Sequence, residues 1–422
     1  PVMNKLTIIG AITAISTVAT VGFLYFFGVS NAIRPLLLQL PVTFSPSVVR
    51  FCPSSDLSSL LGFPVPVHYN GGPDPSLIFT PNLTIDITRL PEFDHEDGFG
   101  FIAKFKNTFI SGEWLTIYDC DVTYFPGGCQ AWNAEFPLDR LRMPGVAVTQ
   151  LGRVVVISQF WGYGYYHWFI EGFLRLALVY DYLMENPDVK IVMYTMGSTP
   201  EFMSLIGIDP SRIVPYVDSR VYFASSAVVP SPSACGSAIG PAALRFRDLF
   251  RTNAMLKYGD QLKLQDETAF RIVVQNRGSK GEARSLENHD ELVQALRDHM
   301  PDIIIDVMDP HENLASTIVK HYYANIVIGP HGAGLSNILF APPGATMIEL
   351  HPNLGNHHEY GRHNVNSCHQ KSARDVGARE ILLIEDNGTS TTSFRANIDR
   401  ILNIVNMIRN DMFTGVFYDS IE

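Results

Sequence analysis

The clearest chemical signal in the sequence is a glycine-rich segment, Gly329-Pro330-His331-Gly332-Ala333-Gly334-Leu335-Ser336-Asn337. It follows the apolar run 325–328 and precedes a helical pattern. Glycines let the backbone turn tightly and bring free N–H groups at the positive end of a helix close to a phosphate. His331 would add a donor or a cation toward the same oxygens. The spacing fits equally well a tight strand-to-helix turn with a capping histidine, and the third glycine of the dinucleotide fingerprint is missing.

A basic loop, which contains Arg277, Lys280 and Arg284, follows a second apolar run at 271–275. The planar guanidinium group suits a diphosphate, and three cations on one loop would neutralise a departing nucleotide without a metal ion. A solvated basic loop is the alternative. If both runs are strands of one parallel sheet, their following loops lie at the same carboxyl edge, where such sheets bind ligands. Glu349 ends the next apolar run, where it would bind a ribose hydroxyl pair or simply face solvent.

Three polar residues, His167, Glu171 and Arg175, are spaced i, i+4 and i+8 in a helical pattern and should share one face. Trp161 and Tyr165 lie just before them, and aromatic side chains of this kind would suit the acceptor side of a sugar-binding cleft. We expect His167 or Glu171 to act as a base or to position an acceptor. The alternative is a buried polar ladder that holds the helix in place.

Two acidic segments resemble metal sites. Asp119-Cys120-Asp121 matches the Asp-x-Asp signature of metal-dependent sugar transferases, and Asp94-His95-Glu96-Asp97 offers further ligands. A tripeptide match is weak, a disulfide at Cys120 would explain the first segment differently, and a solvated charge run explains the second. We therefore expect no required cofactor and no metal site, although a divalent ion remains an open alternative.

The pattern of elements favours an α/β fold with two Rossmann-like halves. Short apolar runs alternate with helical patterns, most clearly from residue 270 onward, as in right-handed βαβ units of a covered parallel sheet. The expected organisation is a transmembrane signal anchor at 6–29, a proline-rich stem at 30–75, an N-terminal acceptor domain at 76–240, a C-terminal nucleotide-sugar domain at 241–390, and a helix within 391–422 that packs back across the junction.

Composition limits the partners of the protein. The 422 residues include 31 basic and 42 acidic side chains, and the resulting net charge of -11 argues against nucleic acid as a partner. Residues 6–29 carry no charge and are long enough to cross a bilayer. We expect a single-pass type II protein of the Golgi or endoplasmic reticulum membrane with a lumenal body. The five cysteines fit that compartment, and their connectivity is open.

The segments IVIGPHGAGLSNILFAPPGATMIEL, YYHWFIEGFLRLALV and QNRGSKGEARSLENHDELV resemble glycosyltransferase family 61, which includes plant core xylosyltransferases and O-linked N-acetylglucosamine transferases. The resemblance implies a GT-B fold, in which two Rossmann-like domains face a cleft, and inverting transfer from a UDP-sugar to a glycan or glycoprotein. It also implies a donor-phosphate site of Arg277, Arg284, His331 and the turn 332–335, with Glu349 near the nucleotide. Asn276 and Gly172 depart from the family pattern, and the region before about 110 matches none of it.

Two other functions fit the same sequence features. The first is a membrane-anchored glycan-binding protein that has kept the fold and lost transfer activity. The second is a metal-dependent transferase that uses Asp119 and Asp121.

Overall fold

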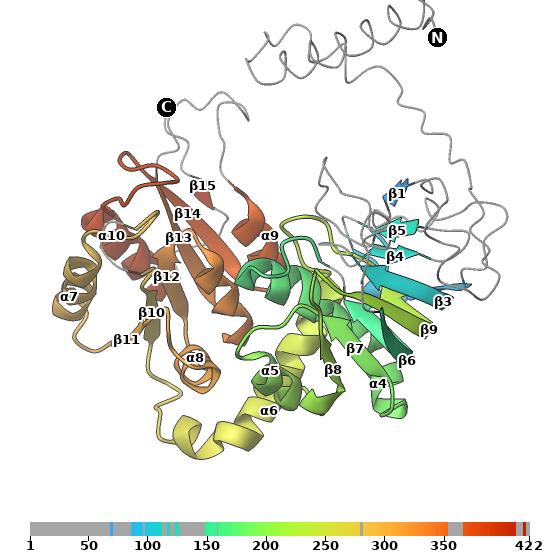
Figure 1. The fold of residues 1–422 in the computed structure, drawn as a ribbon. Coiled ribbons are helices and arrows are strands. Elements are labelled where there is room, and N and C mark those ends of the chain that lie inside the picture. The colour runs from blue at the N-terminus through green and yellow to red at the C-terminus, as the bar shows by residue number, and fades with distance from the viewer. Residues whose placement is uncertain are drawn as a thin grey trace, which may run out of the picture. The chain divides into compact units, whose positions relative to one another are not determined.

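The computed structural model describes residues 68–70, 86–95, 98–111, 116–118, 123–125, 148–157, 159–278, 282–352, 366–410 and 417–418. They form two β-sheets with helices, which confirms the α/β class (Figure 1). The expected anchor at 6–29 and nearly all of the stem lie outside these residues. Among the helices that are described, none combines the length and the apolar character needed to span a membrane.

The first sheet contains nine described strands in the order β1-β5-β4-β3-β9-β6-β7-β8, with β2 paired to β3. The strands are β1 (His68–Asn70), β2 (Asp86–Arg89), β3 (Phe101–Ser111), β4 (Thr116–Tyr118), β5 (Thr123–Phe125), β6 (Val148–Ile157), β7 (Lys190–Met193), β8 (Ile213–Pro215) and β9 (Val221–Pro230). The four strands from β9 to β8 are parallel. The pairs β2–β3, β3–β9, β3–β4 and β4–β5 are antiparallel.

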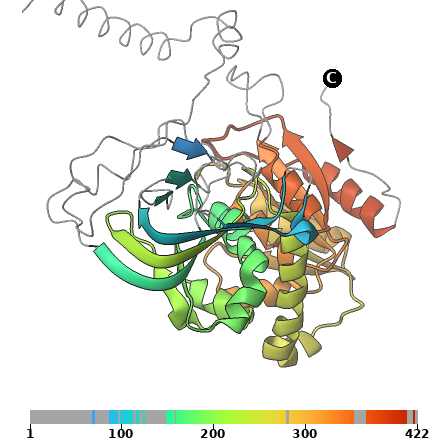
Figure 2. The same ribbon diagram turned by 90° about the vertical axis from the view of Figure 1, so that its right-hand side faces the viewer.

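The expected Rossmann-like pattern therefore holds for only part of this half of the chain. In β3 buried residues such as Phe101, Ala103 and Phe105 alternate with less buried ones, a pattern that suits an antiparallel strand with one covered face. In β6 the run Val154–Ile157 is buried on both sides, as expected for a covered parallel strand. Figure 2 shows β3 and β9 running side by side along this curved sheet.

The second sheet is parallel throughout and agrees with the alternation in the sequence. Its order is β11-β10-β12-β13-β14-β15. The strands are β10 (Arg271–Gln275), β11 (Ile304–Met308), β12 (Ile326–Pro330), β13 (Thr346–Pro352), β14 (Arg379–Glu385) and β15 (Phe417–Tyr418). From β10 the chain first adds β11 on one side and then crosses to β12 on the other. The strand order thus reverses between β10 and β12, which is where open α/β sheets bind ligands.

Helices cover both faces of the second sheet. Its helices are α7 (His289–His299), α8 (Leu314–His321), the 3-10 helix η7 (Ala333–Phe340), α9 (Cys368–Asp375) and α10 (Ile398–Arg409). Buried side chains of α7 and α10 share one apolar cluster with Ile272, Val274 and Ile328 of the sheet. α10 was expected to pack back across the junction, but its buried face instead belongs to this cluster, beside α7 (Figure 1).

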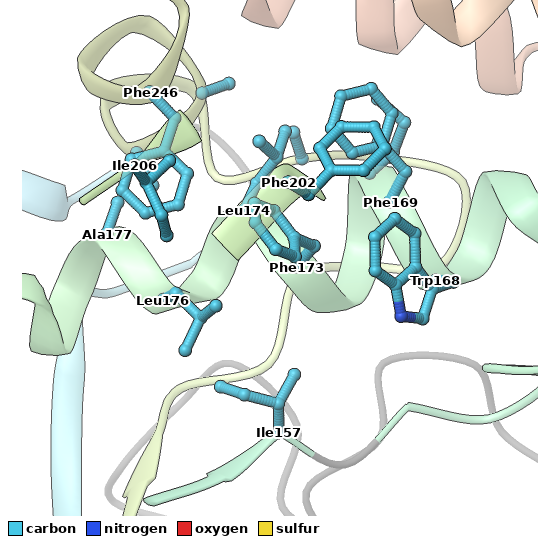
Figure 3. Packing of buried hydrophobic residues seen from close by; sticks show 14 of the residues in the cluster. Ile157, Trp168, Phe169, Phe173, Leu174, Leu176, Ala177, Phe202, Ile206 and Phe246 are labelled. Atoms are coloured by element: carbon cyan, nitrogen blue, oxygen red, sulfur yellow. The ribbon is translucent and has the colours of Figure 1, made fainter. Parts of the chain in front are cut away.

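A second apolar cluster joins the first sheet to the opposite face of the second sheet. Its centre is a group of aromatic rings on different elements. Phe169 lies 4.9 Å from Phe202 and 5.8 Å from Phe340 between ring centroids, and Phe173 lies 6.1 Å from Phe250. Figure 3 shows Phe169, Phe173 and Phe202 together in this core. Such rings bury large apolar areas, so the cluster stabilises both regions at once.

The helices of the first region lie over this core. They are η3 (Pro91–Phe93), the π-helical turn η4 (His167–Gly172), the 3-10 helix η5 (Phe173–Val179), α4 (Tyr180–Glu185), α5 (Thr199–Leu205), η6 (Pro210–Arg212) and α6 (Gly240–Lys263). The 24-residue α6 contacts η5 on one side and α8, α9 and η7 on the other. The helical pattern that contains His167 and Glu171 is confirmed, although the helix changes from π to 3-10 geometry at Gly172.

Candidate functional site

The loops that follow β10 and β12 meet at the point where the strand order reverses. Nη1 of Arg277 donates a 2.9 Å hydrogen bond to the backbone carbonyl of His331, and its Nε donates a 3.2 Å bond to the carbonyl of Ala283. Residues from two motifs that are 54 positions apart are therefore in direct contact. This is the common sheet edge that the sequence predicted.

The glycines after β12 make room for side chains of β10. A Cβ atom on Gly332 would overlap the guanidinium group of Arg277, and one on Gly334 would overlap Oε1 of Gln275. A Cβ on Gly329 would lie 2.9 Å from Cβ of Gln275. The backbone of Gly332 is extended, with φ 169°, so its need for glycine is one of space and not of conformation. The glycines thus let Arg277 and Gln275 approach the turn closely.

Arg277 and Arg284 form a half-buried pair of cations. Burial, together with the neighbouring Arg284, lowers the pKa of Arg277 to about 10, and burial also lowers the pKa of Arg284. Among the described residues no carboxylate lies within ion-pair distance of either guanidinium group, and Nε of Arg284 is buried without a hydrogen-bond partner. Arg284 also has a positive φ of 62°, uncommon for a side chain with a Cβ. Two half-buried cations without an ion pair among the described residues favour an anionic ligand at this edge.

His331 and Glu349 lie behind the turn and not on its surface. His331 is 5% exposed and Glu349 is 1% exposed, and Nδ1 of His331 is hydrogen-bonded to Oε1 of Glu349. Burial and the two arginines lower the pKa of His331 to about 3, so its side chain is neutral near pH 7. The expectations that His331 supplies a cation or caps the turn, and that Glu349 faces solvent, are therefore wrong. The short polar contact between them holds the turn against β13.

His167 and Glu171 form the hydrogen-bonded pair that the i, i+4 spacing predicted. Nδ1 of His167 lies 2.7 Å from Oε2 of Glu171. The carboxylate is fully buried and also accepts hydrogen bonds from the side chain of Gln159 and, at 2.6 Å, from the backbone N–H of Gly236. The side chain of His167 is 26% exposed. This arrangement fixes the ring through Nδ1 and leaves Nε2 to accept a proton.

Of the residues expected on the acceptor side, Trp161, Tyr165 and Arg175, only Trp161 has a ring contact with His167 among the described residues. The ring of Trp161 lies 5.1 Å from that of His167, and Trp161 is 40% exposed. The hydroxyl of Tyr165 donates a 2.8 Å hydrogen bond to Oδ1 of Asn337, at the end of the glycine-rich segment. Tyr165 therefore connects the first helical motif to the turn after β12.

Arg175 does not belong to this group. It is 1% exposed and donates from Nε to the backbone carbonyl of Ser231 at 2.8 Å and from Nη2 to that of Pro230 at 2.5 Å. The i+8 prediction assumed a regular α-helix, whereas here a π-helical turn is followed by a 3-10 helix with about three residues per turn. The change of geometry turns Arg175 toward β9, where it stabilises the end of that strand.

Sequence reasoning missed several residues that hold these motifs together. The hydroxyl of Tyr166 lies 3.0 Å from the carbonyl of Gly236, 2.9 Å from that of Cys368 and 2.6 Å from Oγ of Ser372. The amide Nε2 of Gln275 lies 3.2 Å from Nε2 of His321, which is fully buried. Their spacing carries no helical or strand period, so only the fold brings them to the site.

The remaining sequence candidates lie elsewhere. Lys280 and the Asp119-Cys120-Asp121 segment are outside the described residues. Asp94 is occupied by Arg89, at 2.8 Å, and by the backbone N–H of Gly100, so it stabilises a surface loop. Cys235 is disulfide-bonded, and Cys368 has a free thiol.

Comparison with known proteins identifies the part of the chain that contains both motifs. Residues 165–348 match the model of the family described as Glycosyltransferase 61. A segment of 82 residues is 33% identical to the protein O-linked-mannose beta-1,4-N-acetylglucosaminyltransferase 2 of Tetraodon nigroviridis. This segment covers 19% of the present chain and only 14% of that relative. Residues 165–348, which contain the His167–Glu171 pair and the Arg277–His331 contact, therefore belong to a glycosyltransferase 61 domain, as the sequence motifs predicted.

Proposed function

We propose that this protein is an inverting glycosyltransferase that moves a sugar from a UDP-sugar to a hydroxyl group of a glycan or glycoprotein. The observation that carries the proposal is the half-buried pair Arg277 and Arg284, which have no carboxylate partner among the described residues and lie where the strand order reverses. An anionic diphosphate is the ligand that such a pair would stabilise. The family match supports a sugar nucleotide as its source.

In the proposed donor site the diphosphate lies against the loops after β10 and β12. Arg277 and Arg284 would bind its oxygens, and the first turn of η7, at Ala333 and Gly334, would add backbone N–H groups that a helix leaves without an intrahelical partner. The neutral ring of His331 would hold the turn in place through Glu349 instead of binding the phosphate. These groups would stabilise the charge that develops on the departing UDP.

His167 is the proposed base. Its Nε2 would take the proton of the acceptor hydroxyl as that oxygen attacks the anomeric carbon from the face opposite UDP. The bond between that carbon and the phosphate oxygen breaks, and its electron pair remains with UDP. Glu171 would hold the ring through Nδ1 and stabilise the imidazolium that forms. Attack from the opposite face inverts the configuration.

The hydrogen bond between Tyr165 and Asn337 supports one shared reaction site, because it connects the segment just before His167 to the glycine-rich segment of the proposed donor site. A GT-B arrangement, with acceptor and donor halves facing a cleft, is consistent with the two sheets and remains part of the proposal. Xylose and N-acetylglucosamine are the proposed sugars, the first from the family resemblance and the second also from the name of the fish relative. No divalent ion is expected to be required at the diphosphate.

The proposed location is the Golgi or endoplasmic reticulum membrane, with residues 6–29 as a type II anchor and a lumenal body. The uncharged run 6–29 supports the anchor. The disulfide at Cys235 supports a lumenal body, because disulfide bonds persist mainly in oxidising compartments.

The test is UDP release by the purified protein from a panel of UDP-sugars, with and without hydroxyl acceptors, alongside thermal unfolding with each nucleotide. We expect one UDP-sugar to raise the melting temperature and to yield UDP that depends on acceptor and on His167. Stabilisation by a glycan with no UDP release from any donor would instead identify a glycan-binding protein. If no nucleotide changed either readout, the proposed donor site would be wrong.

A further inference from the structure

Three buried side chains with metal-ligating atoms lie together behind the glycine-rich turn. They are His331, from the loop after β12, and Cys368 and His369, from the first turn of α9. One ring nitrogen of each histidine and Sγ of Cys368 lie within 4.8 Å of one another. The ring centroids of His331 and His369 are 5.0 Å apart. Small movements of the side chains would bring these atoms to the spacing of ligands around one ion.

His369 is a buried member of this cluster with an unsatisfied ring nitrogen. It is 1% exposed, and its Nδ1 has no hydrogen-bond partner among the residues that the structure describes. A buried nitrogen without a partner destabilises the fold, and a metal–nitrogen bond would satisfy it.

Cys368 supplies the second indication. Its thiol is free and buried, and no step of the proposed transfer uses it. Oxidation to a disulfide would require a second sulfur, and the described Cys235 is already disulfide-bonded. A metal ion would displace the thiol proton and bind the thiolate.

The contact between His331 and Glu349 matches the usual surroundings of a metal-bound histidine. Histidine ligands commonly donate their second ring N–H to a carboxylate, which fixes the tautomer and the ring orientation. Here Nδ1 of His331 is bonded to Glu349, so Nε2 is the nitrogen that faces a ligand role. The ring centroid of His351 lies 4.7 Å from that of His331. Nδ1 of His351 is hydrogen-bonded to the carbonyl of Pro352, so its Nε2 is a further possible metal ligand.

We propose that His331, Cys368 and His369 bind a structural zinc ion, with Glu349 holding His331 in place. One thiolate and two imidazoles favour zinc over Mg²⁺ or Mn²⁺, which prefer oxygen ligands. The ion would fasten α9 to the turn after β12. The ion would lie behind the turn that contains His331 and would take no part in the proposed transfer step.

The first test is the metal content of the full chain, purified without a histidine tag. We expect about one zinc per chain by elemental analysis, and about a tenfold or greater reduction in the variants Cys368→Ser and His369→Gln. His299→Gln, in an exposed histidine, is the matched control and should retain the metal. A folded wild-type protein that contains no zinc, and that added zinc does not stabilise, would overturn the proposal.

A second variant separates this site from the histidine-rich segment of the sequence. His357, His358 and His363 also offer nitrogen ligands. The triple change to glutamine should leave the zinc content unchanged. Zinc that is lost from this triple variant and retained in Cys368→Ser would place the metal elsewhere and refute the assignment.

If Cys368→Ser does not fold, the wild-type protein still provides a decision. Replacing zinc with Co²⁺ should give an intense near-ultraviolet absorption band from thiolate-to-cobalt charge transfer, which requires a cysteine ligand. Cobalt that binds without this band would exclude Cys368 as a ligand and overturn the proposal.

Discussion

Arg277 donates from Nη1 to the backbone carbonyl of His331 at 2.9 Å, so the start of the basic loop after β10 is in direct contact with the glycine-rich turn after β12. This contact lies at the point where the strand order of the second sheet reverses. The position of the Arg277 guanidinium group therefore depends on the backbone of the loop after β12. Changes in either loop should therefore affect the same ligand.

Arg277→Ala should reduce UDP-sugar turnover far more than it reduces stability. Arg277 is half-buried and its hydrogen bonds to other described residues go to loop carbonyls, whereas a charged hydrogen bond to a diphosphate is worth about 1.5–3 kcal/mol, or roughly 10–100-fold in rate. Initial rates and melting temperatures would measure the two effects. Arg153→Ala, which removes an exposed ion pair with Asp188, is the control and should change neither strongly. Equal loss of folding in Arg277→Ala would argue for a structural role.

Gly332→Ala should weaken donor binding by displacing Arg277. The added Cβ would overlap the guanidinium group, which can move because it is the end of a flexible side chain. We expect a raised KM for the UDP-sugar and a small change in melting temperature. Gly197→Ala is the matched control, because no atom lies within 4 Å of the Cβ it would add. An unchanged KM in Gly332→Ala would mean that the position of Arg277 does not matter to the donor.

His167→Gln should lower kcat by about 10²–10⁴-fold if His167 is the base, with a smaller change in KM for the UDP-sugar. Glu171→Gln should also lower kcat, because the amide no longer fixes the ring with a charged acceptor. The loss of kcat should be larger in His167→Gln than in Glu171→Gln, since only the first change removes the proposed base. Normal turnover in His167→Gln would reject the assignment.

His321 should make stability depend on pH between about 4 and 6.5. Burial lowers the pKa of His321 from 6.5 to about 4 in the folded protein, so the unfolded chain binds a proton that the folded chain excludes. The contribution is fully present above pH 6.5 and is lost as the pH falls toward 4, by up to about 3 kcal/mol. Denaturant unfolding of His321→Gln should show a shallower loss over this range than the wild type. If stability fell equally with pH in the wild type and in His321→Gln, the His321 ring would have the same pKa in the folded and the unfolded protein.

The parallel sheet and the His167–Glu171 pair could be predicted because each rests on a local period. Strands such as β10 and β12 are short buried runs, and residues four apart on a helix are neighbours. Arg175 was misplaced because the same rule fails when a π-helical turn meets a 3-10 helix. The sequence contains Gly172 at that point but does not reveal the change in geometry.

Other features depend on contacts that no local pattern records. His331, Glu349 and His369 come from three separate elements, so their common burial appears only in the folded chain. The helix α6 was missed because the exposed leucines at 244 and 256 blur the apolar stripe that faces the core. The antiparallel part of the first sheet was also missed. It joins the parallel part through β9, which pairs with both β3 and β6, and two serines interrupt the apolar pattern of β9 that would have marked it as a strand.

The position of α6 limits how this protein can be recombined with its relatives. The helix contacts η5 of the first region and also α8, α9 and η7 of the second, and Phe246 and Phe250 belong to the ring cluster that both regions share. A chimera joined at 240/241 or just after Lys263 would therefore set one parent's helix against the other parent's partners. Exchanging donor specificity between homologues will require matched substitutions along both sides of this helix, wherever the crossover is placed.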